Sequence, residues 1–440
     1  MGSRSAVVLW LVSIAIGIAV FTLINDQVPD PYLDEIFHIP QTFQYCRGNF
    51  RQWDPKITTP PGLYVFGFAW AKLLNQDCNV GVLRSVNFVG GHILLPFLLG
   101  IMSANGTYGI VLSNVPIVWF FSNLYYTDVW STILIFGSMV TNQLSPWLGA
   151  FLAAVSLAFR QTNIVWAVFS AGYLVIQRQR NSANGVQKDE ASSLVQQIYE
   201  LVLTACTTSL DAVFSYGLVG LLFGVFIYYN EGITMGDKEN HAVGLHGAQI
   251  LYFSLFTVFL SWPAWTSRLL IDRYLKRLTT QWHLVAFEIA AIVIVIEKFT
   301  IVHPFILADN RHYTFYLWRR LIQPSWSLYA KYLLVPVYHF GTWNILSSLT
   351  RSVSIITTLL FVGCTLATLV PSPLFEPRYY IVPYLLWRTL VIKSLPRVCK
   401  YRIAIEAVWN LAINSITAYV FIYKPFEWSH EPGVLQRFMW

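Results

Sequence analysis

The chain has 440 residues, of which 55% are hydrophobic and only 12% are charged, and its mean hydropathy is +0.52. This composition excludes an ordinary soluble protein and indicates a membrane protein. The net charge of +7 does not indicate a nucleic-acid partner. The basic residues instead form short clusters beside apolar runs, at 268–277, 319–320 and 393–402, as expected at the cytoplasmic ends of membrane helices.

Long apolar runs recur along the whole sequence. A helix needs about 20 apolar residues to cross a bilayer, and these runs do not alternate as barrel strands do. We therefore predict an all-α polytopic membrane protein with roughly 12–14 transmembrane helices and short loops. The predicted crossings are 6–24, 61–77, 83–103, 106–126, 128–142, 145–158, 161–177, 211–229, 247–262, 284–302, 327–344, 352–371, 378–394 and 403–423.

The first predicted crossing is expected to be retained, because no cleavage site of small residues precedes Asn25. The loop that follows, 25–62, carries five of the 22 acidic residues: Asp26, Asp30, Asp34, Glu35 and Asp54. Asp34 and His38 are four residues apart, so a short helix would place both on one face. A carboxylate beside an imidazole can handle a proton. The structural alternative is a solvated, charged loop with a helix cap.

The charge pattern also predicts which connections share a side of the membrane. Arg4 precedes the first helix, so loop 25–62 is expected to face away from the cytoplasm. Segments 230–246 and 302–313 are expected on that same face, and the polar tract 178–200 is expected to be a cytoplasmic linker. An even number of crossings must then separate 25–62 from 230–246. Seven are predicted there, so we expect that one short run within 128–158 does not cross.

We expect a single membrane domain over 1–440 in which the three outward segments form a shared site. Charged residues in or beside apolar runs, such as Arg160, Glu297, Lys298 and Arg378, are either structural ion pairs or functional groups. Together they suit a pocket for a lipid-borne phosphate.

The sequence contains no Walker loop, no dinucleotide fingerprint and no DxD pair. Asp34 and Glu35 are adjacent and would point about 100° apart on a helix, which is a poor arrangement for chelating one ion. We therefore expect no metal-held nucleotide donor and no metal site. The five cysteines, Cys46, Cys78, Cys206, Cys364 and Cys399, form no CxxC pair, and each is expected to be a structural thiol.

Several long segments resemble one family, and the resemblance covers essentially the whole chain. The family is that of the endoplasmic-reticulum alpha-1,2-glucosyltransferases of the multi-spanning GT-C class, which add the last glucose to the lipid-linked oligosaccharide. The segments that carry the resemblance are Tyr32–Gln41, Gln52–Tyr64, Phe159–Trp166, Gly236–Lys238, Ala308–Tyr313 and Gln436–Trp440.

The resemblance implies a substrate pair and a mechanism. The donor would be dolichyl beta-D-glucosyl phosphate and the acceptor the diglucosylated high-mannose dolichyl-diphosphate glycan, with inversion at the anomeric carbon. The class places an essential carboxylate in the first luminal loop, which indicates Asp34 as the base. Glu35 would be its neighbour, an alternative base or an acceptor-binding group. His38 would tune the base or bind sugar hydroxyls.

The remaining site residues are assigned by charge type and expected face. Candidates for the donor phosphate are Lys298, Arg311, His312 and Arg378, and candidates for sugar contacts are Trp53, Asp54 and Asp309. A dolichyl phosphate leaving group is already anionic, so cations or amide donors suffice to hold it. The resemblance also implies a multi-pass protein of the endoplasmic-reticulum membrane whose active site faces the lumen.

Two alternatives remain open from the sequence. The first is another GT-C transferase that uses dolichyl-phosphate-mannose or adds an earlier glucose. The second is a transporter or a channel-associated protein, which the many helices and buried charges would also allow. The absence of an inverted hydropathy repeat and the concentration of charge in outward loops argue against the second alternative.

Overall fold

The computed structural model describes residues 4–183, 193–239, 243–392 and 400–440. These residues pack into two compact units. The first comprises residues up to 113, 121–240 and 353–365, and the second comprises 114–120, 241–352 and 366–440. The predicted single domain over 1–440 stays a prediction.

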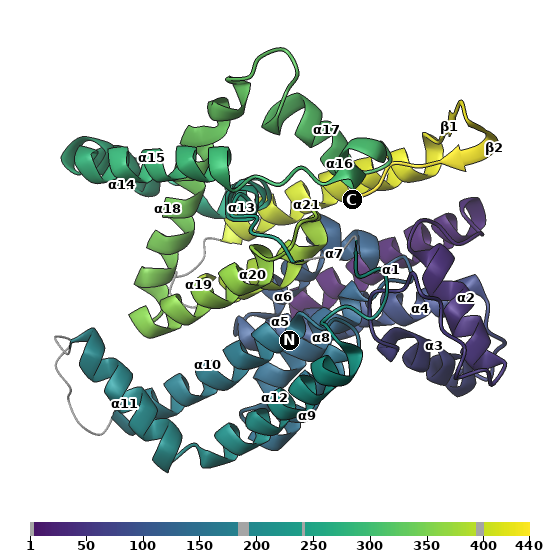
Figure 1. Cartoon of the computed structure of the whole chain (residues 1–440), viewed down its shortest axis with the longest axis horizontal. Helices are drawn as coiled ribbons and strands as arrows, with labels where there is room; N and C mark the ends of the chain where they lie inside the picture. Colours follow the sequence, from purple (N-terminus) through teal and green to yellow (C-terminus); the bar gives the residue numbers. More distant parts are fainter. Residues whose placement is uncertain (1–3, 184–192, 240–242, 393–399) are drawn as a thin grey trace. The chain divides into compact units, whose positions relative to one another are not determined.

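Helices dominate the first unit (Figure 1). They are α1 (Arg4–Gln27), α2 (Glu35–Cys46), α3 (Gly62–Leu73), α4 (Val80–Val89), α5 (Leu95–Met102), α6 (Gly106–Ser113), α8 (Asp128–Thr141), α9 (Pro146–Leu157), α10 (Asn163–Ala183), α11 (Leu194–Thr207) and α12 (Leu210–Asn230). A π-helical turn over Gly90–Leu94 joins α4 to α5. Helices α7 (Pro116–Phe121) and α19 (Ile355–Leu369) each straddle a boundary between the units.

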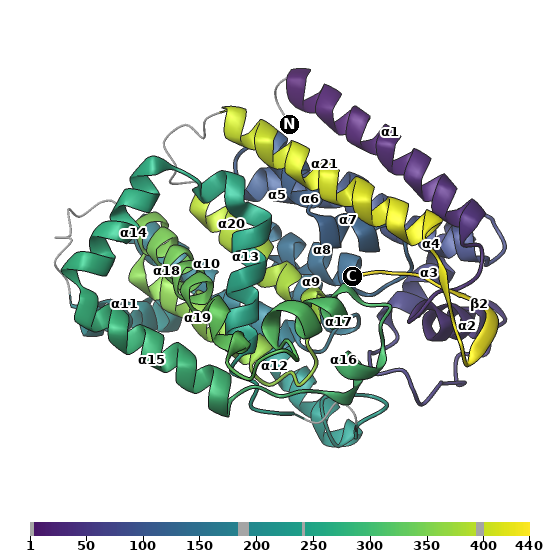
Figure 2. The ribbon, with the colours of Figure 1, turned by 90° about the horizontal axis from the view of Figure 1, so that it is seen from above.

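The second unit is also mainly helical and ends in a small hairpin (Figure 2). Its elements are α13 (Gln249–Trp265), α14 (Arg268–Thr280), α15 (Trp282–Lys298), α16 (Pro304–Ala308), α17 (Tyr313–Leu317), α18 (Val335–Ser352), α20 (Ile381–Ile392), α21 (Lys400–Tyr423), β1 (Phe426–Trp428) and β2 (Glu431–Gln436). The antiparallel β1–β2 pair and one isolated β-bridge depart from the all-α prediction.

Several helices are long and apolar enough to cross a membrane. They are α1, the continuous α4–α5 segment Val80–Met102, α12, and α21 over Tyr401–Tyr423. Helices α14 and α15 pass the same test together but are bent by 97° at their junction, and α8, α9 and α19 are shorter apolar helices. The protein is therefore a polytopic helical membrane protein, as predicted. The number of its crossings stays a prediction.

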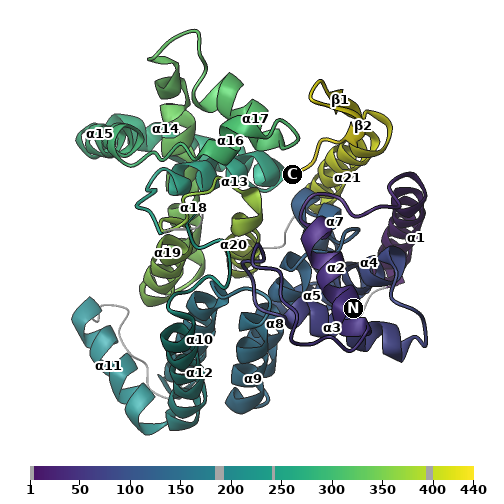
Figure 3. The same cartoon turned by 45° about the vertical axis from the view of Figure 1, so that its right-hand side comes forward.

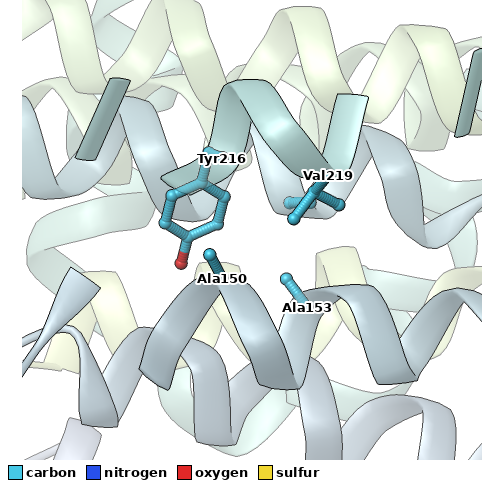
Figure 4. Packing of buried hydrophobic residues seen from close by; sticks show 5 residues of the cluster. Ala150, Ala153, Tyr216 and Val219 are labelled. Carbon is cyan, nitrogen blue, oxygen red and sulfur yellow. The ribbon is translucent and has the colours of Figure 1, made fainter. Parts of the chain in front are cut away.

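Small residues allow the helices of the first unit to pack closely. Ala150 and Ala153 of α9 face Tyr216 and Val219 of α12 in a buried cluster that also includes Ala167 (Figure 4). The hydroxyl of Tyr216 donates to the amide oxygen of Asn142 at 2.9 Å, which satisfies a polar group between helices. Small side chains and interhelical hydrogen bonds of this kind hold helices together in lipid, where no hydrophobic force favours their association.

The predicted crossing at 61–77 is wrong. Helix α3 has only 12 residues, and a disulfide joins Cys46, before α3, to Cys78, after it. If α3 crossed the membrane, these two cysteines would lie on opposite sides, so α3 remains on one side. Figure 3 shows α3 lying beside α2. Without α3, an even number of predicted crossings separates 25–62 from 230–246, and the expectation that one short run within 128–158, where α8 and α9 form, does not cross stays a prediction.

The disulfide also corrects the expectation that every cysteine is a thiol. Neither Cys206, which is exposed, nor Cys364, which is buried, belongs to a disulfide, and Cys399 lies outside the described residues. The predicted linker 178–200 is helical at both ends, in α10 and α11, and its residues 184–192 lie outside the described residues. Two further predicted segments lie partly outside the described residues. These parts are residues 240–242 of the segment 230–246 and residues 393–399 of the basic cluster 393–402.

Candidate active site

Asp34 stands at the N-terminal end of α2, and the adjacent backbone fixes its position. Leu33 has a φ of 51°, a left-handed conformation that a leucine adopts rarely. Backbone conformations of this kind persist only where the surroundings impose them, and they concentrate at functional sites. The Asp34 N–H donates to the Tyr126 hydroxyl at 3.2 Å. The Asp34 side chain makes no capping hydrogen bond to α2, so the structural alternative of a helix cap is not what holds this carboxylate.

Glu35, the next residue, is fully buried and bound on both oxygens. The Arg84 guanidinium donates to Oε1 at 2.9 Å and to Oε2 at 2.6 Å. The N–H of Tyr125 also donates to Oε1, at 2.6 Å, and the N–H of Tyr32 donates to Oε2, at 3.1 Å. A carboxylate enclosed in this way has no surface with which to touch a substrate, whereas Asp34 beside it is half-buried.

Arg84 uses every N–H of its guanidinium to join the end of α1 to the start of α2. Besides Glu35, it donates to the side chain of Asn25 and to the carbonyls of Val28 and Asp30, at 3.3, 2.7 and 3.1 Å. An arginine has five N–H donors, and here all five find acceptors. The loop that carries Asp34 is thereby anchored to α4.

His38 lies one turn beyond Asp34, as the spacing predicts, because its N–H donates to the Asp34 carbonyl at 3.0 Å. The His38 ring is buried, and its Nδ1 is 2.8 Å from the Tyr64 hydroxyl. Tyr64 also packs against Trp53, with ring centroids 5.7 Å apart. Tyr64 of α3 thus connects the imidazole of α2 to the indole of the following loop.

Asp54 and Trp53 are held near α2 by Gln41. The Gln41 amide donates to the Gln52 carbonyl at 2.7 Å and accepts from the Asp54 N–H at 3.0 Å. The structure therefore brings five predicted site residues together in the first unit: Asp34, Glu35, His38, Trp53 and Asp54.

The segment 230–239 packs against the loop 25–62. The Met235 N–H donates to the Thr58 carbonyl at 3.1 Å, and the Asp237 N–H donates to the Pro55 carbonyl at 3.2 Å. A Cβ added to Gly236 would lie 2.1 Å from the Pro55 carbonyl oxygen, so only glycine permits this approach. The segments 25–62 and 230–239 thus meet, as expected for neighbouring parts of one site.

Arg160 forms an ion pair, one of the two roles expected for it, with a partner that the sequence did not identify. Its Nη2 lies 3.1 Å from Oδ1 of Asp128, and the Asp128 side chain is buried. Asp128 begins α8, two residues after the Tyr126 that contacts Asp34. Arg160 is therefore held by a carboxylate two residues beyond Tyr126, whose hydroxyl accepts from the Asp34 N–H.

The other predicted site residues belong to the second unit, so a site shared by all ten stays a prediction. Lys298 is exposed at the end of α15. The Arg378 guanidinium donates to Oε2 of Glu376 from both Nε and Nη2, at 3.1 and 2.7 Å. Asp309 and Arg311 form a two-bond ion pair at 2.9 and 2.7 Å, and His312 lies 3.8 Å from the same carboxylate.

Charge keeps Asp309 ionised. Burial alone would raise the pKa of Asp309, but hydrogen bonds from Arg311 and the electrostatic interaction with His312 lower this pKa overall. Among the described residues, no group of three or more histidine, cysteine or acidic side chains has a geometry that could hold a metal ion.

Sequence reasoning missed Arg84, Tyr125, Tyr126 and Asp128. Arg84 left one usable signal, because it is a lone charge within the predicted crossing 83–103, and such charges are costly in a membrane unless they are functional or paired. Tyr125 and Tyr126 gave none, since aromatic residues are common throughout this chain.

Fold and site together define a polytopic helical membrane protein with an acidic site in the loop that follows its first helix. The sequence matches the DIE2/ALG10 family over residues 28–389, and the chain belongs to that family.

Named relatives match over nearly their whole length. A protein of Yarrowia lipolytica is 37% identical and the match covers 98% of this chain and 97% of the relative. Relatives in Debaryomyces hansenii and Homo sapiens are 37% and 35% identical over 96% of this chain, and the matches cover 96% and 95% of their lengths. Each of the three is named Dol-P-Glc:Glc(2)Man(9)GlcNAc(2)-PP-Dol alpha-1,2-glucosyltransferase.

One solved structure also resembles the chain, the oligosaccharyltransferase of Archaeoglobus fulgidus in the apo form. It has 11% sequence identity and a TM-score of 0.42, and the match covers 95% of this chain and 56% of that chain. A likeness at this level adds nothing to the fold described above.

Proposed function

We propose that this chain is an inverting glucosyltransferase with a GT-C fold. It transfers glucose from dolichyl beta-D-glucosyl phosphate to the diglucosylated high-mannose dolichyl-diphosphate glycan and forms the terminal alpha-1,2 linkage. Family membership and the shared name of the relatives support this reaction. The structural observation that carries it is the setting of Asp34, a half-buried carboxylate held beside a fully bound one in the loop after α1.

The reaction needs one base. The acceptor hydroxyl oxygen attacks the anomeric carbon of the donor glucose, and its proton passes to the Asp34 carboxylate. The bond between that carbon and the phosphate oxygen breaks, and its electron pair leaves with dolichyl phosphate. A single displacement of this kind converts a beta donor into an alpha product.

Glu35 takes a different role from Asp34 in this account. Its buried pair with Arg84 makes it a poor candidate for the base or for an acceptor contact, because proton transfer requires contact with the substrate. We assign it to positioning the Asp34 loop. His38, bound to Tyr64, remains a candidate for orienting the carboxylate or a sugar hydroxyl.

The donor phosphate requires positive groups rather than a base. The candidates are Lys298, Arg311, His312 and Arg378, and Lys298 is the most exposed of them. Arg378 would have to share its guanidinium between Glu376 and the phosphate. The leaving group is already an anion, so these cations suffice on physical grounds and the proposal includes no metal.

The disulfide supports a luminal site. Disulfides form and persist in oxidising compartments such as the lumen of the endoplasmic reticulum and are rare in the cytosol. Cys46 ends α2, twelve residues beyond Asp34, so the bond lies in the same connection as the proposed base. We therefore propose an endoplasmic-reticulum membrane protein with loop 25–79 in the lumen and dolichol-linked lipids as its substrates.

An assay with purified protein tests this function. Synthetic dolichyl-phosphate-glucose and a diglucosylated lipid-linked acceptor should yield a product with one more hexose in alpha-1,2 linkage. Dolichyl-phosphate-mannose, or an acceptor with one glucose, should yield no product. Transfer from the mannose donor would favour the other GT-C activity, and absence of transfer from either donor would contradict the proposal. Restoration of the third glucose in cells that lack it gives an independent check.

A further inference from the structure

The last residues of the described chain hold the segment 309–313 in place. Met439 and His312 form a parallel bridge in which the Met439 N–H donates to the Arg311 carbonyl and the Tyr313 N–H donates to the Met439 carbonyl, both at 2.9 Å. The His312 Nδ1 lies 3.1 Å from the carbonyl oxygen of Trp440. The backbone of residues 439–440, called the tail here, thus pairs with the segment that carries Asp309, Arg311 and His312.

Side chains of the same region strengthen this contact. The rings of Trp440 and Tyr313 meet edge to face with their centroids 5.4 Å apart. Trp428 lies under the Arg311 guanidinium at 4.7 Å, and its indole N–H donates to the Asn310 amide oxygen at 2.7 Å. The tail itself is anchored, because Arg437 donates to the carbonyls of Phe421 and Ile422 at the end of α21, both at 2.8 Å.

The charge arrangement identifies the chemistry of a ligand for this segment. Arg311 is bound by the Asp309 carboxylate on two atoms and by the Gln436 amide oxygen at 3.1 Å. A phosphate placed here would meet the ionised Asp309 and would have to displace it from Arg311. An uncharged sugar meets neither obstacle, since carboxylate, guanidinium and imidazole groups all form hydrogen bonds with hydroxyls.

The three polar side chains remain reachable. Their exposed fractions are 22% for Asp309, 21% for Arg311 and 31% for His312. Aromatic rings lie close to these groups, with Trp428 against Arg311 and Trp440 against Tyr313. Partly exposed polar groups beside aromatic rings suit a hexose, which has both apolar faces and a rim of hydroxyls.

We propose that residues 309–312 form a subsite for uncharged hexose units of the acceptor glycan and that Trp440 is a positioning residue for it. This inference rests on the proposed function and refines it, because it moves Arg311 and His312 from the donor phosphate to the acceptor sugar. Trp440 acts through Tyr313 and the paired backbone rather than by touching the reacting atoms.

Steady-state kinetics of purified wild type, Trp440→Ala and Trp440→Phe test the proposal. In Trp440→Ala, the KM for the acceptor should rise about five- to tenfold, the scale expected from the loss of one aromatic pair, while kcat and the donor KM stay at wild-type values. Trp440→Phe keeps a ring beside Tyr313, so its KM for the acceptor should lie close to the wild-type value. A rise in the donor KM alone, or a fall in kcat with both KM values unchanged, would overturn the assignment.

A binding measurement separates this inference from the proposed reaction. Wild-type protein should bind the free diglucosylated oligosaccharide, without its lipid, more tightly than Trp440→Ala does, and Asp309→Asn should bind it more weakly than wild type. This result would support the subsite even if the wild-type protein transferred no glucose. Equal binding by all three folded proteins would overturn the subsite even if transfer occurred.

Discussion

Arg84 and Glu35 form an ion pair in which both side chains are completely buried, with Nη2 and Oε2 2.6 Å apart. The pair joins α4 to the first residue of α2, immediately after Asp34. Removal of one partner from a buried pair leaves the other charge unpaired in a medium of low dielectric constant, which typically costs about 3–5 kcal/mol.

Glu35→Gln and Arg84→Met should therefore each lower the thermal midpoint of unfolding in detergent strongly. The double variant Glu35→Leu/Arg84→Met should lose less stability than the two single variants combined, because no buried charge remains unpaired. Asp34→Asn is the matched control and should unfold near the wild-type temperature, because the Asp34 side chain does not cap α2. Wild-type stability of Glu35→Gln would contradict the structural role of the pair.

The Cys46–Cys78 disulfide should form in the protein isolated from cells. Peptide mapping without reduction should recover these two cysteines as one linked peptide pair, with Cys206 as a free thiol. Cys46→Ser should destabilise the protein by about 2–4 kcal/mol, the usual range for a native disulfide. Cys206→Ser is the control and should change stability little. Recovery of Cys46 as a free thiol would remove the support for a luminal loop.

Glycosylation sites report the side of the membrane directly. The natural sequon at Asn105 follows α4–α5, which begins beside Cys78 and is long enough to cross. If Cys78 is luminal, Asn105 faces the cytoplasm and carries no glycan, so Asn105→Gln should leave the electrophoretic mobility unchanged. Arg51→Thr creates a sequon at the exposed Asn49 in the first loop, and this variant should gain a glycan that a glycosidase removes. A glycan at Asn105 would reverse the proposed orientation.

The contact between the segments 25–62 and 230–239 can be tested at Gly236. Gly236→Ala would place a methyl group 2.1 Å from the Pro55 carbonyl oxygen, so one of the two segments must move. Overpacking of this kind costs about 1–3 kcal/mol, and we expect lower thermal stability together with lower transfer activity. Gly224→Ala in α12 is the control, because an added Cβ there meets nothing within 4 Å. Equal behaviour of the two variants would argue against a close approach at Gly236.

The sequence predicted the parts of this site that depend on local pattern. The four-residue spacing of Asp34 and His38 predicted one helical turn, and the structure has that turn. The partners of Glu35 could not be found in this way, because Arg84 and Tyr125 are 49 and 90 residues away. A single sequence contains no record of which distant residues meet.

The error over α3 has a similar cause. The run 61–77 is apolar enough to resemble a crossing, and hydropathy alone does not distinguish a helix that spans a membrane from one that lies along it. Helix α3 ends after only 12 residues, at Leu73, and Asn75 just beyond it has a φ of 51°. The disulfide then places the residues before and after α3 on the same side of the membrane. The scattered positions of the cysteines gave no pattern from which the pairing of Cys46 with Cys78 could be predicted.

The most direct test of the central claim is the rate of glucose transfer by Asp34→Asn, measured against wild type at equal concentrations of folded protein. A positioned general base contributes roughly 10²–10⁴-fold to a rate. We predict that Asp34→Asn loses at least about a hundredfold in kcat while its thermal midpoint stays near that of wild type. Transfer by Asp34→Asn at a rate close to wild type would contradict the assignment of Asp34 as the base.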